Sequence, residues 1–244
     1  VAASSTKAKG LTISYAKDQI PAFASLAPGA EGTIELFFPT QTLTKVVKDA
    51  TIKISWQSAI GQIGTVKTDR KTLLAPIVFR YQSDADLAVE TRYYTEEGAP
   101  LGQGPLPPIA GNTTAYRVFW QIKKTLHPLE DIEVKAHVPK IAAWSAKSQA
   151  DSGTVTYDAQ TRMVTWKIKR MPEDISSLTA SFELQLTPET ADDGRFATVL
   201  EETSFQGRDT TLRELLTRKK PIQTTDLQTD DGAKGKGVVR KPAV

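Results

Sequence analysis

Short segments in which apolar and polar residues alternate recur along most of the chain, and this pattern constrains the fold more than any other feature. Within residues 115–123 nearly every second position is apolar: Tyr116, Val118, Trp120 and Ile122. A β-strand turns successive side chains to opposite faces, so such a segment is a strand with one buried face. The same alternation predicts strands at residues 34–38, 52–56, 132–138, 164–168 and 182–186.

Turns rich in proline and glycine separate these segments. Residues 27–29 hold an Ala-Pro-Gly turn, residues 111–112 a Gly-Asn pair, and Asp158 begins a turn that its own side chain can cap. Many short strands divided in this way are typical of antiparallel β-sandwiches. Leucines at helical spacing occur at residues 211–217, but that segment is short and fits an edge strand equally well.

An internal repeat indicates two copies of one module. Residues 13–15 match residues 164–166, residues 34–38 match 182–186, and Pro-Ile pairs end both copies at 76–77 and 221–222. Nothing before Leu11 corresponds to the strands at 115–123 and 132–138. The first copy is therefore a clipped domain, a smaller rearranged sandwich, or an acceptor for a donated strand.

The predicted fold class is all-β, with tandem Ig-like antiparallel β-sandwiches of which the first lacks its N-terminal strands. We expect the first, incomplete or rearranged sandwich at residues 1–82 and the second, complete one at 83–225. Residues 226–244 are rich in Asp, Gly and Lys, which is typical of a tail or linker. We expect this segment to pack along a domain or a neighbouring subunit.

Composition excludes several classes of protein. The 244 residues contain no Cys, which rules out a miniprotein held by disulfides. The longest apolar run, residues 73–79, contains a proline and is far shorter than the roughly 20 residues of a membrane-spanning helix. A net charge of +3 with interleaved signs is too small to indicate nucleic-acid binding.

The second module contains four motifs in a fixed order. They are Gly-Pro-Leu-Pro-Pro at 104–108, the segments at 111–120 and 129–134, and Tyr-Asp…Thr-Arg…Val-Thr-Trp at 157–166. This order resembles the Ig-like conserved repeat, a domain of unknown function, of bacterial cell-surface, S-layer-like and adhesin proteins. Residues 26–33 resemble the start of one of its strands. The resemblance implies an extracellular location and a structural role in a stalk, coat or adhesin.

Residues that could carry chemistry are few. The two histidines, His127 and His137, have no Cys to complete a zinc site, and no nucleophile motif is present, so we expect no catalytic residues, no metal site and no cofactor. Calcium at Asp192-Asp193-Gly194 or Asp230-Asp231-Gly232 is the weaker alternative. Neither fits an EF-hand loop, and adjacent acids are more often solvated turn residues.

Two hypotheses about function follow. The first is a non-catalytic structural module of a bacterial cell-surface protein, which associates with copies of itself or with neighbouring domains, for instance by strand addition at exposed edges. The alternative is an adhesin-type module that recognises a glycan or a host surface protein through loops of the second domain. Its candidate binding surface is Tyr93, Tyr94, Leu106 and Pro107, on or beside the proline-rich loop at 98–112.

Overall fold

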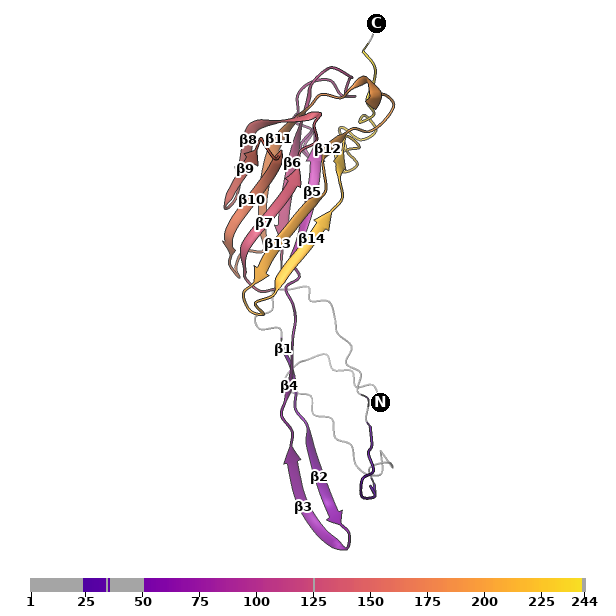
Figure 1. Cartoon of the computed structure of the whole chain (residues 1–244), viewed down its shortest axis with the longest axis vertical. Coiled ribbons are helices and arrows are strands. Elements are labelled where there is room, and N and C mark those ends of the chain that lie inside the picture. Colours follow the sequence, from indigo (N-terminus) through magenta and orange to yellow (C-terminus); the bar gives the residue numbers. More distant parts are fainter. Residues whose placement is uncertain (1–23, 34, 36–50, 125, 243–244) are drawn as a thin grey trace. The chain divides into compact units, whose positions relative to one another are not determined.

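The computed structural model describes residues 24–33, 35, 51–124 and 126–242, and antiparallel strands dominate it (Figure 1). It forms two compact units, Val1–Leu43 and Thr44–Val244, which are considered one at a time. In the first unit the backbone N–H of Ala30 donates to the carbonyl of Ala27 at 2.9 Å, so the predicted turn is present. Among the described residues the only helical segment is the 3-10 turn η2 (Thr190–Asp192), and the all-β prediction is confirmed.

The centre of the second unit is a sandwich of two antiparallel sheets (Figure 1). The first has the order β14 (Leu215–Lys220), β13 (Thr203–Asp209), β7 (Leu129–His137), β10 (Met163–Met171) and β9 (Thr154–Asp158). The second has the order β5 (Asp86–Arg92), β6 (Thr114–Lys123), β11 (Ser177–Leu186) and β8 (Ala142–Ala150). Residues 215–217 thus begin an edge strand, the second of the two predicted alternatives, whereas residues 211–214 belong to the turn before it.

The core between the sheets consists of the alternating residues that the sequence singles out. Those of β6, namely Tyr116, Val118, Trp120 and Ile122, are fully buried, as are the inward residues of β7, β10 and β11. Burial of each such side chain contributes about 1.5–3 kcal/mol. Trp144 on β8 stacks on Tyr157 of β9 with ring centroids 5.4 Å apart, which joins the two sheets along one side.

The predicted turns have the local chemistry that their residues favour. The Oδ1 of Asp158 accepts the backbone N–H groups of Gln160 at 2.8 Å and Thr161 at 3.3 Å. These backbone hydrogen bonds lower the pKa of the Asp158 carboxyl. Gly111 has a φ of +80°, which a glycine adopts without strain, and the N–H of Asn112 closes its turn on the carbonyl of Ile109 at 2.9 Å.

Two nested hairpins repeat one pattern of pairing. In the C-terminal one, β12 (Thr198–Leu200) pairs with β15 (Gln223–Thr224), and β13 and β14 form the hairpin between them. In the N-terminal one, β1 (Thr51–Ile54) pairs with β4 (Ile77–Arg80), and β2 (Gln57–Ile63) and β3 (Val66–Leu73) form the hairpin between them. The repeated Pro-Ile pairs follow β3 and β14. The other two repeat matches, at 13–15 and 34–38, involve residues outside those described.

The segment predicted as a tail or linker is packed onto the loops of the sandwich. Its Leu227, Ala233 and Val239 are buried. Arg240 exchanges backbone hydrogen bonds with Pro108 and Ala110, at 2.9 and 2.8 Å. Residues 226–242 therefore lie along the domain, as expected. The domain boundaries at 82/83 and 225/226 stay a prediction.

Candidate functional site

The chain enters the sandwich beside a buried carboxylate, that of Asp209 at the end of β13. Its side chain is fully buried, and its Oδ2 accepts the backbone N–H of Ser83 at 3.0 Å. The same oxygen lies 2.7 Å from Nδ1 of His127, which is also buried. Oδ1 accepts the N–H groups of Thr211 at 2.8 Å and Leu212 at 3.0 Å. One carboxylate thus joins three loops at this end.

Opposing effects of burial and hydrogen bonding set the pKa of Asp209, and the carboxylate stays ionised. Burial raises the pKa of its carboxyl, but the hydrogen bond from His127 and those from the three backbone N–H groups together outweigh burial and lower the pKa. A carboxylate stabilised in this way is charged at neutral pH. The carboxylate accepts hydrogen bonds from the loop at 211–212 as well as from Ser83, and it also contacts His127. It therefore acts as a structural anchor for the segment around Ser83.

A second buried charge lies at the same end. Lys124 is 3% exposed, and its Nζ donates to the backbone carbonyl of Glu173 at 3.4 Å. Burial lowers the pKa of its ammonium, while the negative charges of Asp84, Glu173 and Asp174 oppose that effect. Asp84 also accepts the N–H of Leu126 at 3.0 Å. Oppositely charged groups therefore surround this lysine where β5 begins.

The other end of the sandwich has its own carboxylate anchor, Asp230 in the C-terminal segment. It is 1% exposed, and its Oδ2 accepts the backbone N–H groups of Tyr93 at 2.6 Å and Tyr94 at 2.8 Å. Its Oδ1 accepts the N–H of Ala233 at 3.2 Å. Gly232 lies against the ring of Tyr94, where an added Cβ would come within 2.7 Å. The C-terminal segment is thus fastened to the end of β5.

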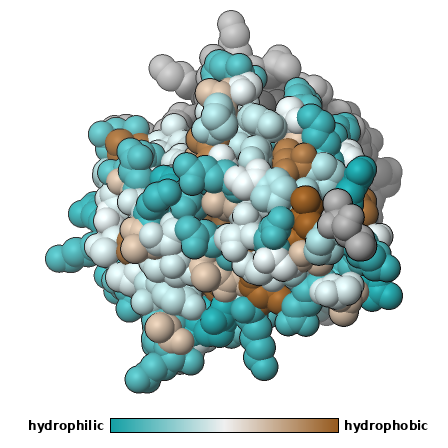
Figure 2. Space-filling model, turned by 90° about the horizontal axis from the view of Figure 1, so that it is seen from above, coloured by the Kyte–Doolittle hydropathy of each residue, from teal (hydrophilic) through white to brown (hydrophobic). Residues whose placement is uncertain are grey.

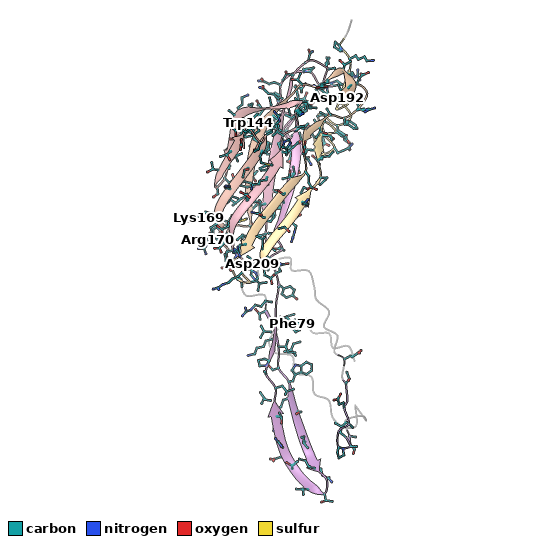
Figure 3. All side chains as sticks on the ribbon, viewed as in Figure 1. Phe79, Trp144, Lys169, Arg170, Asp192 and Asp209 are labelled. Atoms are coloured by element: carbon teal, nitrogen blue, oxygen red, sulfur yellow. The ribbon has the colours of Figure 1, made fainter. Side chains whose placement is uncertain are left out.

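The two anchors lie at opposite ends of the sandwich. β5 runs from Asp86, beside Lys123, to Arg92, beside Arg117, so its two ends lie at the two ends of β6. Figure 3 labels Asp209 at the end where the chain enters and Asp192 at the end that the C-terminal segment covers. Seen from above, apolar side chains form small patches among hydrophilic ones (Figure 2).

The candidate binding residues contribute more to packing than to the surface. Tyr93 is 7% exposed, and its hydroxyl donates to the carbonyl of Gly104 at 2.7 Å. Its ring contacts that of Tyr94 edge to face, with centroids 4.9 Å apart. Tyr94, Leu106 and Pro107 are half-buried, and the first two pack against the core. A binding role for this surface stays a prediction.

The acidic pairs considered for calcium are engaged within the protein. The expectation of a solvated turn is wrong for Asp230, which is buried. Asp192 accepts the N–H of Glu189 at 2.8 Å, and Asp193 lies 3.3 Å from the Nζ of Lys241. Among the residues that the structure describes, no three His, Asp or Glu side chains come together as a metal site.

Sequence reasoning missed the roles of Asp209 and Lys124, since neither belongs to a motif. The only signal for Asp209 is the Asp-Thr-Thr run that begins there, which favours a turn. Two open grooves lie on the surface of the described residues. One, of about 550 Å³, is lined by residues that include Lys140 and Glu189, and the other, of about 610 Å³, lies over β7, β13 and β14.

Comparison with protein families gives one match. The model described as "Adaptor complexes medium subunit family" matches residues 80–220, more than half of the chain, and the chain belongs to that family. This is a different family from the Ig-like bacterial repeat that the motifs resemble. No curated protein matches the sequence.

Solved structures with a similar fold are remote in sequence. The major pilin subunit BcpA of Bacillus cereus is 8% identical (TM-score 0.37), with 65% of this chain and 50% of that chain covered. The full-length major pilin SpaD of Corynebacterium diphtheriae is 7% identical (TM-score 0.38), with 80% and 64% covered. The Fcho1 Mu homology domain of Danio rerio with bound Eps15 peptide is 13% identical (TM-score 0.32), with 70% and 52% covered.

The chain thus spans only about half to two thirds of these three proteins. Because the TM-scores are below 0.5, the fold assignment stands on the pairing of the strands themselves. In the part of the chain that the structure describes, no helix has the length and apolar character needed to cross a bilayer.

Proposed function

We propose that this chain is a non-catalytic structural module that is joined in series to other modules of a bacterial cell-surface protein, such as a stalk, coat or surface filament. One observation carries the proposal. The chain enters the sandwich at one end and its C-terminal segment is fastened at the other, and at each end a buried carboxylate holds backbone N–H groups. Anchors at the two ends suit a module that transmits load from one end to the other.

The pairing of β5 suits such a load. Tension between Ser83, before β5, and the C-terminal segment, which Arg240 joins to the loop before β6, would pull β5 and β6 in opposite directions along their axes. The seven register pairs of β5 with β6 would then be loaded together and not one after another. Hydrogen bonds that must break together resist force better than a ladder that opens from one end. The Asp209 and Asp230 anchors lie at the two points where the load would enter.

Partners of the module would be other protein modules. The family description names subunits of adaptor complexes, so family members are components of larger assemblies. For this chain we propose self-association or contact with neighbouring domains of a longer chain, outside the cell. The extracellular location rests on the motifs in residues 104–166 that resemble bacterial surface repeats.

The adhesin alternative has less support. A recognition surface needs side chains that are free to contact a ligand. Here Tyr93 is buried, and the N–H groups of both tyrosines are used by Asp230. These contacts favour a role for Tyr93 and Tyr94 in holding the C-terminal segment in place.

Single-molecule pulling tests the proposal. Because the chain has no Cys, handles can be attached at Tyr81→Cys and Pro242→Cys without competing thiols. A second pair, at Asp158→Cys and Lys219→Cys, would pull the edge strands β9 and β14 sideways. We expect a clearly higher unfolding force in the first geometry. Equal forces in the two geometries, or a lower force end to end, would contradict a load-bearing role.

A further inference from the structure

Four aromatic rings form a row that runs from the core of the sandwich to its β8–β9 side. Trp120 of β6 contacts Phe182 of β11 edge to face, with ring centroids 4.9 Å apart. Phe182 lies 5.4 Å from Trp144 of β8, which stacks on Tyr157 of β9 at 5.4 Å (Figure 3). Trp120 and Phe182 are fully buried, whereas Trp144 and Tyr157 are half-buried. This aromatic row therefore connects a buried indole with a phenol that reaches solvent.

The side chains of the aromatic row suit one-electron oxidation. Cysteine is the side chain that oxidants commonly attack, and this chain has none. Indole and phenol rings are then the side chains that lose a single electron most readily. Rings in contact exchange an electron quickly, and at neutral pH a tyrosyl radical is more stable than a tryptophanyl radical. An oxidised Trp144 therefore takes an electron from Tyr157, the ring that it stacks on.

The surroundings of Trp120 favour transfer in the same direction, out of the core. Its Nε1 is buried and has no hydrogen-bond partner among the residues that the structure describes. Loss of an electron from this ring would leave a positive charge beside no acceptor for the indole proton. An unpaired charge in an apolar core is unfavourable, whereas Tyr157 can release its proton to water. The free energy of the oxidised state therefore falls from Trp120 towards Tyr157.

We propose that the aromatic row carries oxidising equivalents out of the core, and that Tyr157 is the site where one-electron oxidation of the sandwich ends. An external one-electron oxidant, such as an inorganic radical, removes an electron from Trp144, and the indole N–H proton passes to water. Trp144 then regains an electron from Tyr157 and a proton from water. The Tyr157 phenol loses that electron and gives its proton to water. The products are an intact indole, a neutral tyrosyl radical and the reduced oxidant.

Pulse radiolysis of the full chain with the azide radical, which oxidises accessible indoles, tests the proposal. All samples carry Trp56→Phe, because Trp56 is a half-buried indole outside the row. The absorption of the tryptophanyl radical should decay while that of the tyrosyl radical rises. Tyr157→Phe keeps the ring but lacks the hydroxyl, and it should slow this transfer by at least about tenfold. Tyr94→Phe, at a half-buried tyrosine outside the row, is the matched control and should leave the rate unchanged.

A second variant tests whether Tyr157 is oxidised through its neighbour. Trp144→Phe keeps an aromatic ring between Phe182 and Tyr157 but removes the indole that gives up the electron. Mass mapping after exposure to the radical should find the modification at Tyr157, and much less of it in Trp144→Phe. A transfer rate that Tyr157→Phe leaves unchanged, an equal loss in Tyr94→Phe, or undiminished modification of Tyr157 in Trp144→Phe would overturn the proposal. None of these outcomes depends on the load-bearing role.

Discussion

The two nested hairpins show how one local pattern leads to different degrees of burial. In the C-terminal hairpin, Val199 and Leu200 of β12 are fully buried and β13 is flanked on both sides. In the N-terminal hairpin, Ile77 and Phe79 of β4 are about half exposed, and β2 has one partner among the described residues. Local pairing is thus formed within each hairpin, whereas burial of the C-terminal hairpin depends on the other strands of the sandwich that pack around it.

Truncating one leucine in each hairpin should give the largest difference. Leu216 on β14 is buried and Leu73 on β3 is exposed. Leu216→Ala should lower the free energy of unfolding of the sandwich by about 2–5 kcal/mol, because it leaves a cavity in a packed core. Leu73→Ala should change it by less than about 0.5 kcal/mol. Urea denaturation followed by tryptophan fluorescence measures both, and similar losses would refute the comparison.

Removing the carboxylate at the first anchor should have the next largest effect. Asp209→Ala leaves the N–H groups of Ser83, Thr211 and Leu212 without their acceptor, which should cost about 3 kcal/mol. Glu214→Ala is the control. Glu214 lies nearby, and the hydrogen bond that its carboxylate accepts from the side chain of Gln82 is exposed to solvent. A loss for Asp209→Ala no greater than that of the control would show that this end is not anchored by the carboxylate.

The second anchor should contribute somewhat less, because Asp230 holds one segment and not several loops. Asp230→Ala should cost about 2 kcal/mol and should speed hydrogen exchange at the amides of Tyr93 and Tyr94. Asp231→Ala, a substitution of the exposed neighbouring residue, is the matched control. Unchanged exchange at the two tyrosines in Asp230→Ala would argue against the anchor.

Acid should remove part of the Asp209 contribution. Its pKa in the folded protein is lower than in the unfolded chain, so its stabilising effect is complete above about pH 4 and is lost as the pH falls through the folded-state pKa. Below about pH 5, the difference in unfolding free energy between the native chain and Asp209→Asn should shrink as the pH falls through the folded-state pKa of Asp209. A difference that grows on acidification would have the wrong sign.

Much of the sandwich follows from the sequence. The alternation at residues 115–123 predicts the buried face of β6, and Asp158 predicts its turn, because both depend on interactions within a few residues. The burial of Asp209 and Asp230 does not follow, since their partners lie up to 137 positions away. The half-buried state of Tyr94 likewise depends on a segment whose composition is typical of a linker.

Hydrogen exchange on the full chain, free of any partner, tests the central comparison most directly. The account predicts that the amides of β13 and β14 exchange only on global unfolding, at rates that reflect most of the stability of the domain. The amides of β2 and β3 should exchange faster by orders of magnitude, because their apolar side chains are exposed and, among the described residues, β2 pairs with β3 alone. Equal protection of the two hairpins in the isolated chain would contradict the account.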